Sequence, residues 1–117
     1  MNLTEQLVTL HNDGQAVTTS LAIAEGTKVQ HKNVMELVKN NLEDFEAFGE
    51  VAFQTRLNKQ GSPTEYALLT EPQATLLLTF MRNSEIVKRF KVALVKAFYE
   101  LRKNLSPAEQ LLMQAQR

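Results

Sequence analysis

The sequence predicts an α+β domain with a winged-helix-like helix-turn-helix core, two small β-hairpins and a long C-terminal helix. Three observations predict this class. A short and a longer helical segment, joined by a turn that contains Gly26, occupy residues 18–38. A second hairpin pattern follows at 51–69, and a long amphipathic stretch fills 85–103. Two helices joined by a short turn are a common means of placing a helix in the major groove of DNA.

The first predicted elements are a β-hairpin and a short helix. Asp13-Gly14 supplies the positive φ angles of a tight turn between apolar stretches at 7–10 and 15–17. Thr18 or Thr19 then caps a helix over 20–25, and Gly26 is expected to end it.

The second helix is predicted to begin with a capping box. Thr27 and Gln30 have the spacing at which a side chain and a backbone N–H satisfy each other in both directions, so the helix should run over 28–40. Val34 and Val38 fall on one face of it. Residues 42–48 either continue this helix or form a separate turn before Gly49.

The second hairpin is predicted where a winged helix carries its wing. Val51, Phe53, Thr55 and Leu57 alternate with polar residues as in a half-buried strand, and the turn at 59–63 leads to a partner strand at 65–69. A second capping box, Thr70 with Gln73, opens a helix that is expected to reach residue 81.

The long helix over 85–103 carries two apolar stripes. The broad stripe is expected to face the core and consists of Ile86, Phe90, Ala93, Leu94, Ala97, Phe98 and Leu101. The narrow stripe of Val92, Val95 and Tyr99 lies on the far side, and we predict it as a homodimer interface. The alternative is that a final helix, capped at Ser106, folds back over it. We therefore divide the chain into a DNA-binding domain at 1–103 and a C-terminal helix or the start of a linker at 104–117.

Composition narrows the class of protein. Cysteine is absent, so thiol catalysis and disulfides are excluded. The chain shows no signal-peptide pattern and no membrane-length apolar run, which favours a cytoplasmic location. Net charge is zero, but residues 82–103 hold seven basic and two acidic side chains, whereas 36–50 hold one basic and five acidic. A neutral chain with this asymmetry can still present a basic surface.

Candidate DNA contacts lie on the second helix and on the wing. Outside the apolar face of the helix are lysines, which suit phosphates, and an asparagine, which can pair with adenine edges. The candidates are Lys28, Lys32, Asn33 and Lys39 on the helix, and Arg56 and Lys59 on the wing. The alternative is that these residues are ordinary solvated positions. His31 falls close to Val34 and Val38, which indicates a structural role.

The sequence does not predict an enzyme. The two histidines, His11 and His31, lie in different predicted elements, and neither a phosphate-binding loop nor a nucleophile motif is present. We expect no cofactor, no metal and no catalytic residue.

Two linked motifs resemble the phage regulatory protein Rha family. They are VTTSLAIAEGTKVQHKNV at 17–34, and YALLTEPQATLLL at 66–78 followed by VKRFKVALVKAF at 87–98. The second arrangement is also similar to Bro-type and KilA-type N-terminal domains, which are regarded as DNA-binding modules. The resemblance implies a phage or prophage regulator that binds double-stranded DNA in transcription regulation. The alternative is an antirepressor-like module that binds a phage repressor or a host protein.

Overall fold

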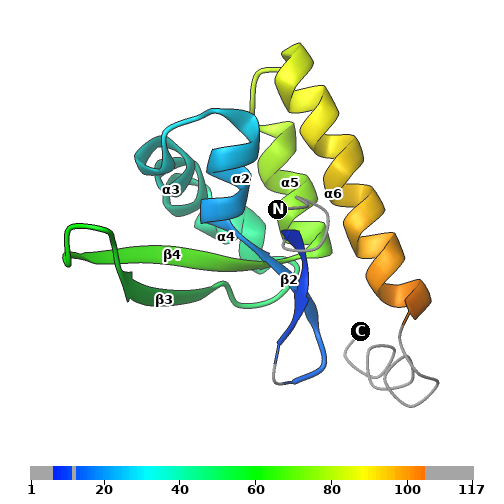
Figure 1. Ribbon diagram of the computed structural model, residues 1–117, viewed down its shortest axis with the longest axis horizontal. Coiled ribbons are helices and arrows are strands. Elements are labelled where there is room, and N and C mark those ends of the chain that lie inside the picture. Colours follow the sequence, from blue (N-terminus) through cyan, green and yellow to red (C-terminus); the bar gives the residue numbers. More distant parts are fainter. Residues whose placement is uncertain (1–6, 12, 105–117) are drawn as a thin grey trace.

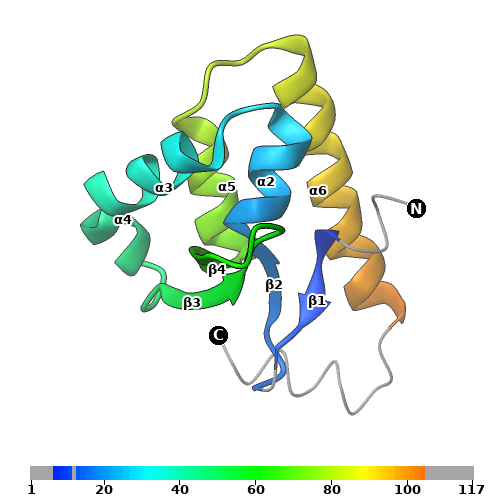
Figure 2. The same ribbon diagram turned by 60° about the vertical axis from the view of Figure 1, so that its left-hand side comes forward.

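The computed structural model describes residues 7–11 and 13–104, and its helices lie to one side of an antiparallel four-stranded sheet (Figures 1 and 2). The α+β class predicted from the sequence is confirmed. The strand order is β1-β2-β4-β3. The elements are β1 (Thr9–Leu10), β2 (Ala16–Thr19), α2 (Ser20–Thr27), α3 (His31–Asn40), α4 (Leu42–Glu46), β3 (Ala52–Leu57), β4 (Pro63–Thr70), α5 (Glu71–Thr79) and α6 (Glu85–Asn104).

Both predicted hairpins are present, and they share one sheet. β2 pairs with β4 in the register Val17↔Thr70 and Thr19↔Leu68, which joins the β1–β2 hairpin to the β3–β4 hairpin. Nothing in the sequence pattern predicted this pairing. Residues 63–67 of β4 lie beyond the end of β2 and pair with β3, so the end of the β3–β4 hairpin projects from the sheet (Figure 1). Leu57, expected on the buried side of a strand, is 69% exposed there, since it forms the last pair of the ladder, with Pro63, at the end of the hairpin.

α2 begins as predicted and ends differently. The hydroxyl of Thr19 accepts a hydrogen bond from the backbone N–H of Ala22 at 3.0 Å, which makes Thr19 the N-cap. The prediction that Gly26 ends the helix was wrong. The helix continues to Thr27, and Lys28 closes it in the left-handed conformation with φ 61°.

Gly26 is required by packing between helices. A Cβ at this position would lie 2.0 Å from Cδ1 of Phe90 in α6. Such a separation is far inside van der Waals contact, so a glycine lets α2 and α6 approach closely. This contact fixes α6 against the first helix of the predicted helix-turn-helix.

The predicted capping box of the second helix was also wrong. Thr27 belongs to α2, and its hydroxyl donates to the carbonyl of Ile23 at 2.6 Å. α3 starts only at His31, after Gln30, which makes no side-chain capping bond. Because Thr27 turns its hydroxyl back into its own helix, it cannot serve the next one. Residues Leu42–Glu46 form a separate short helix, α4.

The capping box at the start of α5 is confirmed. Gln73 accepts a hydrogen bond from the backbone N–H of Thr70 at 3.0 Å. Its side-chain amide also donates to the carbonyl of Gly49 at 2.8 Å. Gln73 is almost fully buried, so one side chain both caps α5 and fixes the turn that follows α4. The helix ends at Thr79, two residues before the predicted end.

α6 has the predicted extent and, with one exception, the predicted core face. Phe90, Leu94 and Phe98 are buried. Ile86 was expected in the core but is 46% exposed, and Val87 is buried in its place. The helix begins just before these residues, so its first turn lies at the margin of the core. The predicted helix after Ser106 falls outside the described residues.

In the described part of the chain, no helix combines the length and the apolar character that crossing a bilayer requires.

Candidate nucleic-acid interface

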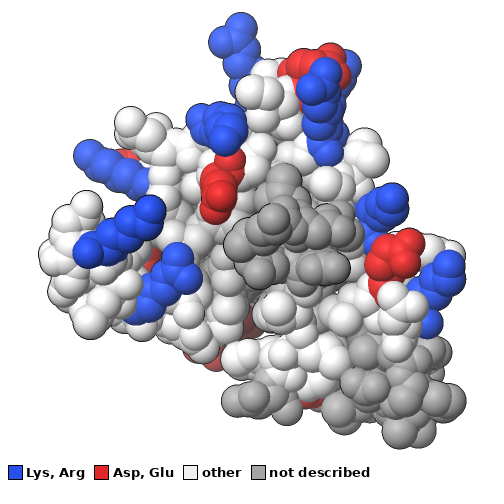
Figure 3. Space-filling model, viewed as in Figure 1, with Lys and Arg blue, Asp and Glu red and all other residues white. Residues whose placement is uncertain are grey.

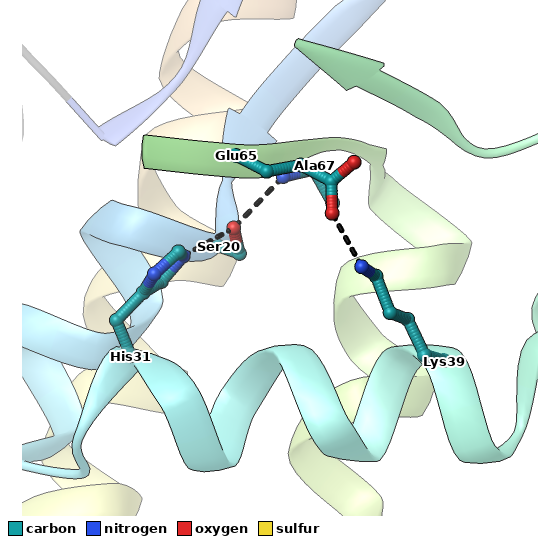
Figure 4. Close-up of polar contacts among 5 residues, drawn as sticks. All are labelled: Ser20, His31, Lys39, Glu65 and Ala67. Atoms are coloured by element: carbon teal, nitrogen blue, oxygen red, sulfur yellow. Dashed lines mark hydrogen bonds and ion pairs between the residues drawn. The ribbon is translucent and has the colours of Figure 1, made fainter. Parts of the chain in front are cut away.

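A buried serine connects the starts of α2 and α3 to the sheet (Figure 4). The Ser20 hydroxyl oxygen accepts a hydrogen bond from the backbone N–H of Ala67 at 2.9 Å and lies 2.9 Å from Nε2 of His31. β2 stops pairing with β4 at Leu68. The backbone N–H of Ala67, the preceding residue of β4, would therefore lack a hydrogen-bond acceptor in β2. Ser20 supplies the missing acceptor, which a buried N–H requires. The serine therefore substitutes for a strand residue at the point where β2 becomes α2.

His31 has the structural role that its place on the helix predicted. Its ring lies near the Ser20 hydroxyl, which already accepts from Ala67 and can donate its own proton to a neutral imidazole nitrogen. Burial lowers the pKa of His31 below its ordinary value, and the positive charge of Arg56 lowers it further. Both effects favour the neutral ring.

The other end of α3 is held by a contact on the surface. Lys39 forms an ion pair with Glu65 of β4 (Figure 4), and its ammonium nitrogen lies 5.7 Å from the ring centre of Phe53. Both charged side chains remain about half exposed, so water screens the pair and its contribution to stability is small. Lys39, a predicted DNA contact, is thus engaged by an acidic residue of the hairpin.

The remaining predicted contacts on the second helix divide into two groups. Lys32 and Asn33 are exposed on α3, as predicted. Lys28 is exposed but does not belong to that helix, because it closes α2 in the turn between the helices. The prediction that Lys28 lies on the second helix was therefore wrong, although the residue precedes α3 by only a few positions.

The end of the β3–β4 hairpin has a defined conformation. The Asn58 side chain accepts hydrogen bonds from the backbone N–H groups of Gln60 and Ser62 at 3.0 and 2.9 Å. Gly61 has a φ of 80°, which a residue with a Cβ adopts at a cost. This turn holds Lys59 at the exposed end of the hairpin.

Arg56 of β3 lies against a tyrosine of β4. Its guanidinium lies 5.9 Å from the ring centre of Tyr66, and the Tyr66 hydroxyl donates to the Gln54 side chain at 3.0 Å. A hollow of about 310 Å³ separates the hairpin from the start of α2. Its lining consists of Leu21, Arg56, Leu57, Asn58, Lys59 and Thr64. The hairpin thus brings Arg56 and Lys59 together beside the first helix.

Charge is divided along this surface. In Figure 3, basic side chains gather over α3 and the β3–β4 hairpin at the left of the view, and a second group follows α6. The acidic side chains of residues 36–46 lie on the C-terminal half of α3 and on α4. All of them are exposed, namely Glu36, Glu43, Asp44 and Glu46. The basic part of the candidate site is therefore the N-terminal half of α3 together with the hairpin.

The predicted interface on α6 is exposed. Val92, Val95 and Tyr99 are 70%, 57% and 55% exposed. The homodimer at these residues stays a prediction.

Within residues 7–11 and 13–104, no group of three His, Asp or Glu side chains is arranged to hold a metal ion.

Sequence reasoning missed several residues of this site. Ser20 was read only as part of a helix, and Glu65 and Tyr66 only as strand residues. Their partners come from distant segments of the chain, so local spacing contains no signal for them.

A family model described as phage regulatory protein Rha matches residues 18–103. The chain belongs to this family. The match runs from β2 to α6 and includes every element of the candidate site. A role in phage regulation follows for the chain. No curated protein and no solved structure matched it.

Proposed function

We propose that this Rha-family domain is a non-enzymatic regulator that binds double-stranded DNA in the cytoplasm of the bacterial host. α3 would face the major groove, and the β3–β4 hairpin would act as a wing along the backbone. Lys32, Arg56 and Lys59 would contact phosphates, and Asn33 is the candidate for reading a base edge.

The proximity of the hairpin to the N-terminal end of α3 is the observation that carries this proposal. His31 at the start of α3 lies 2.9 Å from the Ser20 hydroxyl that bonds Ala67 of β4, and Lys39 near the other end of α3 pairs with Glu65 of β4 (Figure 4). Lys32 is exposed on the same helix. Basic groups from two elements can therefore contact one stretch of backbone. Lys28 is exposed in the turn that precedes α3 and would add a further basic group.

Lys39 has a conditional role in this proposal. Its ammonium is paired with Glu65, so a phosphate must compete with a carboxylate for it. We therefore expect Lys39 to add less affinity than Lys32 or Arg56.

A titration with labelled random-sequence duplex DNA tests the proposal. At about 50 mM salt, Arg56→Glu should weaken binding roughly tenfold, and the slope of log affinity against log salt should become shallower by about one unit. Arg82→Glu is the matched control, because it makes the same charge change in the loop before α6. Absence of binding by the wild-type chain at this salt, or equal losses in the two variants, would overturn the proposal.

The second candidate function is that of an antirepressor-like module that binds a phage repressor or a host protein. The exposed apolar side chains of α6 and the zero net charge favour it. Capture from host lysate before and after nuclease treatment separates the two functions. A protein partner remains bound after nucleic acid is removed.

A further inference from the structure

α6 turns a second surface away from the core. We call it the outer α6 face. It consists of exposed residues on one side of the helix, namely Lys88, Arg89, Val92, Val95, Lys96, Tyr99 and Lys103. On the opposite side, Phe90, Leu94 and Phe98 are buried against the rest of the domain. The outer face is thus presented on a helix that the core holds in place.

The apolar residues of this face have the spacing of a helix–helix seam. Val92, Val95 and Tyr99 stand at i, i+3 and i+7, which are consecutive a, d and a positions of a heptad. An apolar stripe of this kind fits the stripe of another amphipathic helix. Its length of about 10 Å, at 1.5 Å per residue, corresponds to two turns.

The charges beside the seam are mostly basic. Arg89, Lys96 and Lys103 recur every seven residues along one edge, which is the e position of the same heptad. Lys88 lies on the seam itself. Two acidic residues accompany them. The Glu85 carboxylate lies 3.8 Å from the Arg89 guanidinium, and Glu100 follows Tyr99 next to the edge that Lys96 and Lys103 form. Arg102 points elsewhere, since it pairs with Glu71 of α5.

This pattern argues against a second copy of the chain as the occupant. An antiparallel self-pair brings e positions together and sets Lys96 against Lys96. A parallel self-pair sets e against g, where the chain carries Lys91. Either arrangement places like charges side by side, which is unfavourable.

The chain's own segment at 105–117 lacks the complementary charge. It carries one acidic residue, Glu109, and one basic residue, Arg117. It therefore offers no acidic edge to match three basic side chains.

We propose that the outer α6 face binds an amphipathic helix of another protein, with an apolar stripe against Val92, Val95 and Tyr99 and acidic residues against Arg89, Lys96 and Lys103. The inference rests on the second candidate function, binding of another protein, and deepens it by naming the surface and the chemistry of the partner. This surface is separate from α3 and the hairpin, so it does not depend on DNA binding. Apolar contact would supply the affinity, and the charges would select the partner and its register.

Two synthetic helical peptides test this inference on the full chain. Both have leucine at a and d positions, and one carries glutamate at e and g where the other carries lysine. By fluorescence anisotropy without nucleic acid, the glutamate peptide should bind about tenfold more tightly than the lysine peptide. Val95→Asp should weaken the glutamate peptide about tenfold, since it places a charge in the seam.

Charge reversal tests the predicted specificity. Lys96→Glu should weaken the glutamate peptide and strengthen the lysine peptide, whereas Arg82→Glu should change neither. Circular dichroism checks that each variant is folded. Equal binding of the two peptides, or unchanged binding by Val95→Asp, would overturn the proposal whatever the DNA titration shows.

Two further outcomes would assign the face to another occupant and thereby overturn the proposal. The first is a dimer in light scattering that Val95→Asp converts to a monomer. The second is a chain ended at Asn104 that binds the glutamate peptide while the full chain does not.

Discussion

α3 and α6 both present charged faces to solvent, but different residues separate their charges. On α3, Glu36 and Asn33 stand among the lysines, and Lys39 is held by an acidic residue of the hairpin. On α6, the residues among the basic groups are exposed valines and a tyrosine. A polar face with hydrogen-bonding groups suits the hydrated surface of DNA. An apolar stripe beside like charges suits a protein helix of opposite charge.

The difference shows why the net charge of the chain says little about the charge of either surface. Zero net charge describes the average of an acidic α4, a basic hairpin and a basic α6. Recognition depends on the local field, which is screened over about 8 Å at physiological salt. Two functions on two helices are compatible with a neutral chain.

The substitution with the largest expected effect should disturb the α3 and α6 surfaces together. Gly26→Ala places a methyl group inside the Phe90 ring, and overpacking of this kind should lower the free energy of unfolding by about 3 kcal/mol. Because the contact joins α2 to α6, DNA binding and peptide binding should weaken in parallel. Thermal unfolding by circular dichroism measures the change in stability.

Gly61→Ala is the control for this variant. Its Cβ would meet nothing within 4 Å, although its φ is 80°, so only the backbone cost of about 1 kcal/mol is expected. Equal destabilisation by the two variants would show that contact with Phe90 is unimportant.

A smaller effect is expected on how the free energy of unfolding depends on pH, and it should involve α3 and not α6. The pKa of His31 is lower in the folded protein than in the unfolded chain, whose value is near 6.5. The unfolded chain then binds more protons, so stability is fully present above pH 6.5 and declines as the pH falls toward the folded pKa. Chemical denaturation between about pH 5 and pH 7.5 measures the decline.

His31→Gln supplies the comparison, because glutamine does not titrate. The variant should lose most of the slope below pH 6.5. A slope equal to that of the wild type would contradict a role for His31. Binding of the glutamate peptide to α6 should not follow the His31 titration while the protein remains folded.

The smallest expected effect concerns the ion pair at the end of α3. Glu65→Gln releases Lys39, and affinity for duplex DNA should rise about two- to threefold, in keeping with the small energies of exposed pairs. Glu43→Gln makes the same charge change on α4 and should have less effect. If the two variants gain equally, total charge and not the release of Lys39 is responsible. Peptide binding to α6 should not change.

Local signals in the sequence predicted local features well. The Asp13-Gly14 turn, the Thr19 cap and the Gln73 capping box each depend on residues within a few positions of one another, and the structure contains all three. The capping box predicted at Thr27 failed although its spacing was correct. Its hydroxyl had a competing acceptor in the preceding turn of its own helix, which spacing does not reveal.

Contacts between distant segments could not be predicted. Gly26 was read as a helix end because glycine often serves there, whereas its small size matters for Phe90 far along the chain. The hydrogen bond between Ser20 and Ala67 could not be predicted either, because only the pairing of β2 with β4 brings the two residues together. The candidate site was therefore predicted as a set of elements and only partly as a set of contacts.

The pairing of β2 with β4 also constrains how the domain folds. Val17 and Thr70 are adjacent in the sheet but more than fifty residues apart in the chain, and α2 and α3 both lie within the loop that they close. Closing so long a loop costs entropy before its contacts form, which slows folding. A peptide cut to 18–50 would lose the strand that Ser20 bonds, so the packed pair of α2 and α3 is expected to form as a product of the whole domain's folding and not as its nucleus.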